Sequence, residues 1–296
     1  MARPSPADGG AYVRTDDGTS IFYTDRGTGA PALALCDGIL CDGFIWKYLE
    51  PHFAARTRVV HMHYRGHGRS GPPGDPDAIG LDAHADDLAQ VLAAAGVERA
   101  VVVGHSMGVQ VALEMVRLHR ERVAGLILCC GAAGRVLATF HSSGLLKTLF
   151  PSLLDVVTRR PDFARALWTR FPADLGFQVA RLMGEVHRGR MRREDLLPYL
   201  QQMVKVDFSL FTRMLAKVDQ HTAEGLLPSI TVPTLILVGE RDTFTPPAVG
   251  YAMADKIPGA EILVLSEGSH AALLEHADLV NERVERFLRE RLGASA

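Results

Sequence analysis

The sequence has no long apolar run. Spanning a bilayer takes roughly 18 consecutive apolar residues, and residues 124–134, the nearest candidate, fall short of that length. Residues 1–10 are polar and rich in proline, glycine and alanine, without the basic and apolar regions of a signal peptide. We therefore expect a disordered lead-in at residues 1–10 and no membrane span.

The sequence also lacks a strong charge of either sign. It has 32 Lys and Arg residues against 34 Asp and Glu residues, which gives a net charge of -2. It has no long Lys/Arg run that could neutralise a row of phosphates. The charge therefore argues against nucleic acid as a partner.

Cysteine is scarce, and motifs that bind metals or nucleotides are missing. The four cysteines show neither C-x-x-C spacing nor the density of a disulfide scaffold. Reduced, buried thiols and a cytoplasmic location are the expectation. There is no H-E-x-x-H, no paired Cys/His spacing and no G-x-G-x-x-G after a strand, so no metal and no cofactor are predicted.

What is present is an alternation of strand and helix patterns. With 296 residues and 47% hydrophobic content, the chain can bury a large core, and one core domain with an insertion is expected. Short apolar and β-branched runs alternate with helical patterns, which is typical of parallel strands joined by crossover helices. The turn pair Asp17-Gly18 predicts an antiparallel hairpin at the start. Strands are expected at residues 11–14, 20–24, 32–36, 58–63, 100–103, 125–130, 234–238 and 261–265.

Residues 134–228 break this alternation, because they contain helical patterns and no strand pattern. We interpret them as a helical lid inserted between two parts of the core, residues 11–133 and 229–296. Most apolar lid residues should pack against each other and the core, while a few, with Trp168 as a candidate, should roof the site. Helices of the core are expected at 46–54, 81–95, 107–119, 246–256 and 277–292, and those of the lid at 145–157, 162–171, 175–187 and 194–215.

The clearest chemical motif is Gly104-His105-Ser106-Met107-Gly108, a G-x-S-x-G string between an expected strand and an expected helix. A serine at such a turn is held in a strained conformation with its hydroxyl exposed above the sheet, and larger neighbours than glycine would clash. The N–H of Met107 at the helix start is a candidate oxyanion donor. Ser106 is the predicted nucleophile.

A serine nucleophile needs an imidazole base and an anion that fixes the tautomer of that base. Asp242 follows the strand expected at 234–238, and His270 follows the last strand, so the chain order is nucleophile, acid, histidine. Glu240 competes with Asp242, but a loop position two residues further on should reach the imidazole better. The turn at residues 131–134 has no carboxylate, which leaves Asp242 as the predicted acid.

Together these segments resemble the α/β-hydrolase superfamily, in its branch of lidded esterases, lipases and epoxide-hydrolase-like enzymes. The matching segments are the R-G-x-G-x-S loop at residues 65–70, the G-x-S-x-G turn, residues 238–242, and His270 with Glu275. The resemblance implies an α/β fold with a mostly parallel eight-stranded sheet, flanking helices and an inserted lid. It also implies that the Ile39 N–H is the second oxyanion donor and that the side chains of Ile39 and Leu40 line the acyl pocket.

The chain departs from the family pattern at two positions. The family has His-Gly after the third strand and an aspartate two residues before the arginine of its R-G-x-G-x-S loop, whereas this chain has Asp37-Gly38 and His63. Asp37 and His63 could form a pair with the two residue types exchanged, or they could be two independent changes. For Arg65 and His67 in the same loop, structural bracing is favoured over substrate contact.

Hydrolysis of a carboxylic ester with a small to medium hydrophobic acyl group is the leading functional hypothesis. Ser106 excludes the dehalogenase and epoxide hydrolase chemistry of relatives with aspartate at the turn. Thioester, lactone or carbon-carbon bond hydrolysis and cofactor-free perhydrolysis would use the same residues, and a ligand receptor on a hydrolase fold is the non-enzymatic alternative. The expected partner is a small-molecule ester contacted by Leu40, His105 and Trp168, and the sequence indicates no oligomeric state.

Overall fold

The computed structural model describes residues 10–135, 186–187 and 189–294, together with positions 159–160, 166, 170 and 178. Trp168 therefore lies outside the described residues. The same holds for all or most of each of the three lid helices expected at 145–157, 162–171 and 175–187. Nine of the ten lead-in residues also lie outside them. In the part of the chain that is described, no helix is long and apolar enough to cross a membrane.

The core is one eight-stranded sheet with the order β1-β2-β4-β3-β5-β6-β7-β8. The hairpin strands β1 and β2 pair antiparallel and most other neighbours are parallel, as the sequence predicts, while β2 also pairs antiparallel with β4. The strands are β1 Gly10–Arg14, β2 Ser20–Arg26, β3 Ala32–Cys36, β4 Val59–Met62, β5 Ala100–His105, β6 Val123–Cys129, β7 Thr234–Gly239 and β8 Glu261–Leu265.

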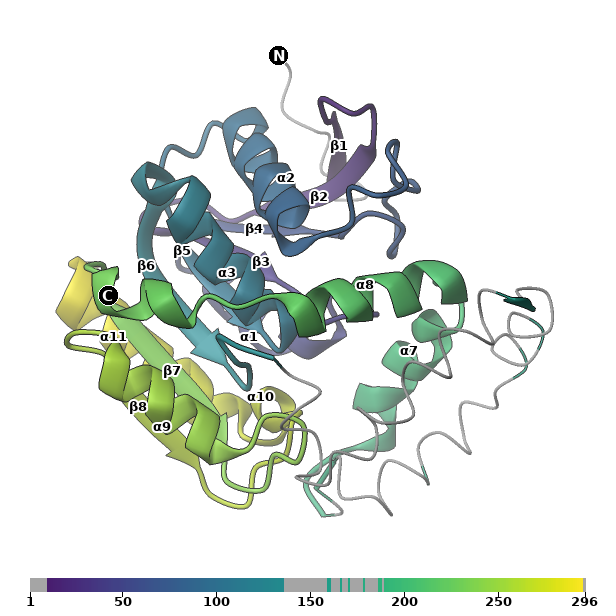
Figure 1. Ribbon diagram of the computed structural model, residues 1–296. Helices are drawn as coiled ribbons and strands as arrows, with labels where there is room; N and C mark the ends of the chain where they lie inside the picture. Colours follow the sequence, from purple (N-terminus) through teal and green to yellow (C-terminus); the bar gives the residue numbers. More distant parts are fainter. Residues whose placement is uncertain are drawn as a thin grey trace.

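Helices cover both faces of the sheet (Figure 1). On one face α2 and α3 pack together and α9 lies against β7 and β8, while on the other α1 packs with α11. The helical segments are η1 Phe44–Trp46, α1 Leu49–Ala54, α2 Leu81–Ala94, α3 Met107–Leu118, η2 Arg120–Arg122, α7 Arg193–Met203, α8 Phe208–Gln220, η4 Glu224–Ser229, α9 Pro247–Lys256, α10 Ala272–Glu275 and α11 Ala277–Leu292.

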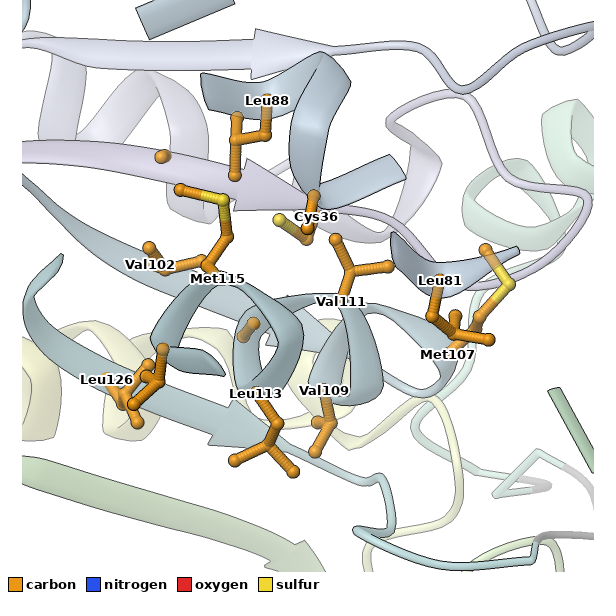
Figure 2. Packing of buried hydrophobic residues seen from close by; sticks show 14 of the residues in the cluster. Cys36, Leu81, Leu88, Val102, Met107, Val109, Val111, Leu113, Met115 and Leu126 are labelled. Carbon is orange, nitrogen blue, oxygen red and sulfur yellow. The ribbon is translucent and has the colours of Figure 1, made fainter. Parts of the chain in front are cut away.

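The central strand β5 serves both faces because successive side chains of a strand point in opposite directions. Val102 joins the cluster beneath α2 and α3, where Leu88 and Met115 also lie (Figure 2). Val101 and Val103 join the cluster on the other face. A strand buried on both faces reads as a continuous apolar run, which is why β5 was visible in the sequence.

The lid prediction needs one correction, since the single helix expected at 194–215 is wrong. Two helices, α7 and α8, occupy this region, and Asp207 separates them by accepting a hydrogen bond from Leu210 N at 2.9 Å. An aspartate in this N-cap position satisfies a helix N–H that has no intrahelical acceptor, so it favours a new helix start. Buried residues of α8, among them Met214 and Val218, belong to the cluster beneath α2 and α3.

All four cysteines are buried and free, as predicted. Burial raises the pKa of each of the four thiols, Cys36, Cys41, Cys129 and Cys130.

Candidate active site

Ser106 stands at the sharp turn between β5 and α3 with φ 54° and ψ -117°. The flanking glycines make this turn possible, as expected from the sequence. A Cβ atom on Gly104 would lie 2.2 Å from the carbonyl oxygen of Gly108, and one on Gly108 would lie 2.0 Å from that of Cys36. The turn therefore holds the Ser106 hydroxyl at the carboxyl edge of the sheet, in a backbone conformation that non-glycine residues rarely adopt.

His270 and Asp242 reach the same edge from the loops after β8 and β7. The Nδ1 of His270 donates to Asp242 Oδ2 at 2.9 Å. Asp242 is 3% exposed and also accepts hydrogen bonds from Phe244 N, Thr245 N and Thr245 Oγ1 at 2.8 to 2.9 Å. Burial opposes ionisation of Asp242, but His270 and these donors outweigh it and lower its pKa. Asp242 is thus a carboxylate that orients the imidazole.

Glu240, the competing carboxylate, does not contact His270 in the hydrogen bonds of the described residues. It accepts instead from Ser266 Oγ at 3.0 Å and from Glu267 N at 2.8 Å in the turn after β8. Of the two candidates, the geometry therefore favours Asp242.

Glu275 fixes the loop that carries His270. Its carboxylate accepts from Ser269 N at 2.8 Å, from Ser269 Oγ at 2.6 Å and from the His187 N–H at 2.7 Å. The sequence pointed to Glu275 only through the family resemblance, because a buried glutamate without a cation partner has no pattern of its own. Thr245, which donates to Asp242, was missed because a threonine in a loop has no sequence pattern that indicates such a contact.

Ser106 and His270 both line one cavity of about 220 Å³. Three lining residues, Leu196, Tyr199 and Leu200, come from α7 in the expected lid. Among the described residues around the cavity, none is a lysine, arginine, aspartate or glutamate. The others are Gly38, Ile39, Cys41, Phe44, Ile45, His105, Val186, Phe244 and Ala271.

The expected substrate contacts differ in where they lie. Ile39 and His105 line the cavity; His105 Nε2 donates to the carbonyl oxygen of His270 at 2.9 Å, and burial lowers its pKa to about 4, so it is neutral. Leu40 does not line the cavity: its backbone has φ 64°, and its side chain packs in the core cluster beneath α2 and α3. Trp168 lies outside the described residues.

The two expected oxyanion donors flank this site. Ile39 lies in the loop after β3, and Met107 is the first residue of α3, where helix N–H groups lack an intrahelical acceptor. The first turn of α3 packs directly on the start of that loop, because a Cβ atom on Gly108 would also lie 2.8 Å from the carbonyl oxygen of Asp37. The start of α3 thus lies against the loop that carries Ile39.

Of the two alternatives for Asp37 and His63, the pair with exchanged residue types is wrong, since the partner of Asp37 is His61. His61 Nε2 lies 2.8 Å from Asp37 Oδ2, whereas His63 Nδ1 accepts from Arg69 N at 2.9 Å. The register pairs Leu35 with His61, but the two strands end at Cys36 and Met62. The pairing of β3 with β4 does not continue to Asp37 and His63, because these two residues lie beyond the ends of their strands.

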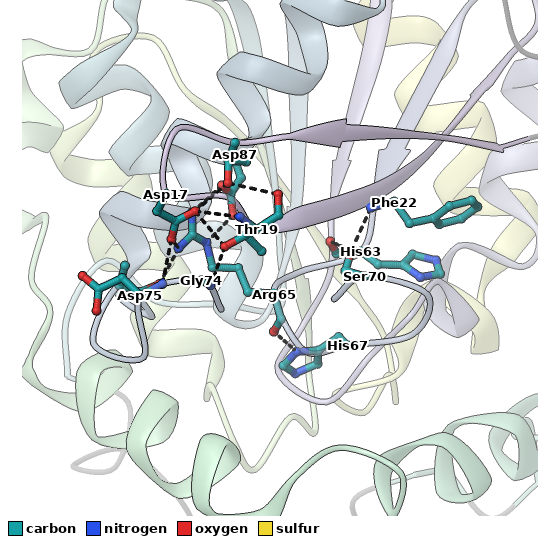
Figure 3. Close-up of polar contacts among 12 residues, drawn as sticks. Asp17, Thr19, Phe22, His63, Arg65, His67, Ser70, Gly74, Asp75 and Asp87 are labelled. Carbon is teal, nitrogen blue, oxygen red and sulfur yellow. Dashed lines mark hydrogen bonds and ion pairs between the residues drawn. The ribbon is translucent and has the colours of Figure 1, made fainter. Parts of the chain in front are cut away.

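Arg65 and His67 brace their loop, as expected (Figure 3). Arg65 forms a two-pronged contact with the buried Asp87, with both nitrogen-oxygen distances 2.7 Å, and a further contact with Asp17 at 2.6 Å. His67 Nδ1 donates to the carbonyl oxygen of Arg65 at 2.9 Å. In the part of the chain that is described, no cluster of His, Cys, Asp and Glu could hold a metal ion.

Comparisons with known proteins place this geometry in a family. The chain is 28% identical over 91% of its length to the polyketide synthase ThaQ of Burkholderia thailandensis, of which it spans only 12%. It is 29% identical to a 2-hydroxy-6-oxononadienedioate/2-hydroxy-6-oxononatrienedioate hydrolase of Burkholderia vietnamiensis, covering 94% of this chain and 95% of that one. Among solved structures, Est816, described as an N-acyl homoserine lactone degrading enzyme, matches with a TM-score of 0.71 and 28% identity, over 94% of this chain and 100% of that one. The family described as alpha/beta hydrolase fold matches residues 31–277, and the chain therefore belongs to the α/β-hydrolase fold family.

Proposed function

We infer that this protein is a serine hydrolase that cleaves carboxylic esters of small to medium hydrophobic acids. The observation that carries the proposal is that Ser106 and His270 line one apolar cavity while the buried Asp242 accepts a hydrogen bond from the Nδ1–H of His270. This arrangement leaves the Nε2 of His270 as the proton acceptor on the ring. An activated serine beside an apolar pocket suits acyl transfer.

The proposed reaction has two halves. In the first, His270 Nε2 takes the proton of Ser106 Oγ as that oxygen attacks the ester carbonyl carbon, and the oxyanion accepts from the N–H groups of Ile39 and Met107. The alcohol leaves with the proton from His270, and the acyl group stays on Ser106. In the second, water attacks this acyl-enzyme with His270 again as base, which releases the acid and restores the serine.

The lining of the cavity favours a neutral acyl group. None of the described lining residues is a lysine or an arginine. None of them would therefore compensate the negative charge of a second carboxylate on the substrate. The relative from Burkholderia vietnamiensis is named for a dioate, which carries two carboxylates. An uncharged ester therefore fits the described pocket better than a dioate does.

A lactone is the second candidate substrate class. Est816 is described as degrading N-acyl homoserine lactones, and a lactone is a cyclic ester that the same serine could open. Both candidates share the acyl-enzyme on Ser106, so one experiment tests the chemistry common to them.

The test is to treat the protein with a fluorophosphonate and to locate the adduct by mass spectrometry. We expect modification at Ser106, and loss of about 10⁴-fold or more in p-nitrophenyl ester turnover for Ser106→Ala and for His270→Ala. The two losses should not add in the double variant, because the residues act as one unit. An adduct at another residue, or turnover that survives Ser106→Ala, contradicts the proposal.

A further inference from the structure

The loop that carries Ile39, residues 37–43 and called the oxyanion loop below, joins β3 to η1. Its first carbonyl, that of Asp37, lies so close to the first turn of α3 that a Cβ atom on Gly108 would come within 2.8 Å of it. Met107, the other expected donor, directly precedes Gly108. The position of Asp37 therefore affects the distance and the orientation between the Ile39 N–H and the Met107 N–H.

Side chains of β4 and of the loop after it hold the oxyanion loop. His61 Nε2 lies 2.8 Å from Asp37 Oδ2, and the Tyr64 hydroxyl donates to the Asp37 carbonyl oxygen at 2.9 Å. The Leu40 N–H donates to His67 Nε2 at 3.3 Å. Of these contacts, the one between His61 and Asp37 joins two side chains, and Asp37 is one of the positions where the chain departs from the family pattern.

His61 also touches the far end of the oxyanion loop. Gly43 has φ 106°, and a Cβ atom there would lie 2.8 Å from His61 Cε1. Glycine lets the backbone pass over the imidazole at this distance without a steric clash. One ring thus contacts both the first residue of the loop and its last.

The pair of Asp37 and His61 is buried. Asp37 is 0% exposed and His61 3% exposed, and within the described residues Asp37 Oδ1 has no hydrogen-bond partner. Burial alone would lower the pKa of His61, but the charge and hydrogen bond of Asp37, with smaller contributions from Glu50 and Asp42, outweigh it and raise that pKa. His61 is therefore the main compensation for a buried carboxylate.

We propose that Asp37 and His61 are positioning residues, which hold the oxyanion loop against α3 so that the Ile39 N–H points at the oxyanion. The inference rests on the proposed function, because it assigns the pair a role in the same site. Neither side chain lines the cavity. The pair acts through the backbone between Asp37 and Ile39.

This role predicts which kinetic constant changes. An oxyanion exists in the transition state and not in the bound ester, so a misplaced donor lowers kcat and leaves KM nearly unchanged. Loss of an oxyanion donor costs about 10²- to 10³-fold in kcat, so a displaced donor should cost about 10- to 100-fold.

The test compares His61→Gln with His61→Asn. The amide nitrogen of glutamine reaches the position of Nε2 in histidine, whereas that of asparagine reaches the position of Nδ1, and only Nε2 contacts Asp37. We expect His61→Gln to retain kcat within about threefold and His61→Asn to lose about 10- to 100-fold, with KM for the p-nitrophenyl ester nearly constant in both. Asp37→Asn weakens the same pair from the loop side and should match His61→Asn.

Asp25→Asn is the matched control, because Asp25 forms a two-pronged ion pair with Arg58 on the sheet and belongs neither to the oxyanion loop nor to the cavity lining. It should lower the free energy of urea unfolding and leave kcat unchanged. If His61→Asn and Asp37→Asn only lower unfolding free energy, with kcat of the folded protein equal to that of wild type, the positioning role is wrong and the proposed function stands. Turnover that survives Ser106→Ala in the same assay overturns both.

Discussion

The hydrogen bonds around Asp242 decide which nitrogen of His270 faces the cavity. Three donors besides His270 hold the carboxylate in place, and they lower its pKa against the effect of burial. The carboxylate stays ionised at neutral pH and keeps the proton of His270 on Nδ1. A neutral amide in its place would donate to that nitrogen and favour the other tautomer.

At the residue scale, we therefore predict that Asp242→Asn lowers kcat by about 10⁴-fold while the fold is retained. Glu240→Gln is the matched control, since Glu240 binds only the turn after β8 in the described structure and should keep kcat within about threefold. Steady-state kinetics with one p-nitrophenyl ester measures both. Equal losses in the two variants would show that the acid was assigned to the wrong residue.

The residues that could be predicted from the sequence are those fixed by the order of elements. Asp242 and His270 each follow a buried strand, so their meeting at one sheet edge could be read from the chain. The partner of Asp37 could not, because it depends on where two strands end within two residues. The direction of the Leu40 side chain could not be predicted either. It depends on a left-handed backbone conformation, which a leucine does not indicate.

At the scale of elements, α7 is docked on η1 and the residues that follow it. Asp195, which is 3% exposed, accepts hydrogen bonds from Lys47 Nζ and from the Tyr48 hydroxyl, the latter at 2.9 Å. The rings of Phe44 and Tyr199 stack with centroids 4.6 Å apart. Because both rings line the cavity, these contacts join α7 to the wall of the pocket.

We predict that Asp195→Asn weakens selection for longer acyl chains. In the wild-type protein, kcat/KM should rise about fourfold per methylene until the pocket is full, which corresponds to about 0.8 kcal/mol of burial. In Asp195→Asn the rise per methylene should be smaller, with turnover of the acetate ester unchanged.

A series of p-nitrophenyl esters of increasing acyl length measures this slope. Glu194→Gln is the control, since the Glu194 side chain is 70% exposed and should leave the slope as it is. Identical slopes in wild type and Asp195→Asn would mean that docking of α7 does not shape the acyl pocket.

The strands and their order could be predicted because each is a short apolar run between turns, and crossover connections restrict the topology. The break between α7 and α8 could not. Apolar periodicity continues across residues 204–207, but a turn follows the end of α7 at Met203, and the side-chain cap of Asp207 starts α8. Capping depends on a local hydrogen bond that competes with continuation of the helix, and the sequence pattern alone favoured continuation.

At the scale of the whole molecule, buried neutral histidines make the fold sensitive to acid. Burial lowers the pKa of His84 to about 3 and those of His63 and His105 to about 4. In the unfolded chain each has a pKa near 6.5. Below pH 6.5 the unfolded state therefore binds more protons than the folded state, and stability falls as the pH falls. His61, whose pKa is raised, contributes in the opposite direction.

His84 offers the clearest test, because it is fully buried and neither ring nitrogen has a hydrogen-bond partner in the described part of the chain. Its ring lies 4.5 Å from that of Tyr64. We predict that His84→Phe raises the free energy of unfolding, and raises it more at pH 5 than at pH 8. The slope below pH 6.5 should decrease by up to about 1.4 kcal/mol per pH unit.

Urea unfolding at several pH values measures these slopes, and the values at pH 8 serve as the internal control because His84 is then unprotonated in both the folded and the unfolded state. Parallel curves for wild type and His84→Phe from pH 8 to pH 5 would show that His84 is not the group that titrates on unfolding.

The burial of every cysteine has a practical consequence for following the expected lid in solution. Maleimides react with exposed thiolates, and all four native thiols are buried with raised pKa values. The native protein should therefore give almost no background labelling. One cysteine introduced at an exposed position of α7, such as Glu194, and another on the core could carry a fluorophore pair, so that distances between α7 and the core become measurable without first removing any native cysteine.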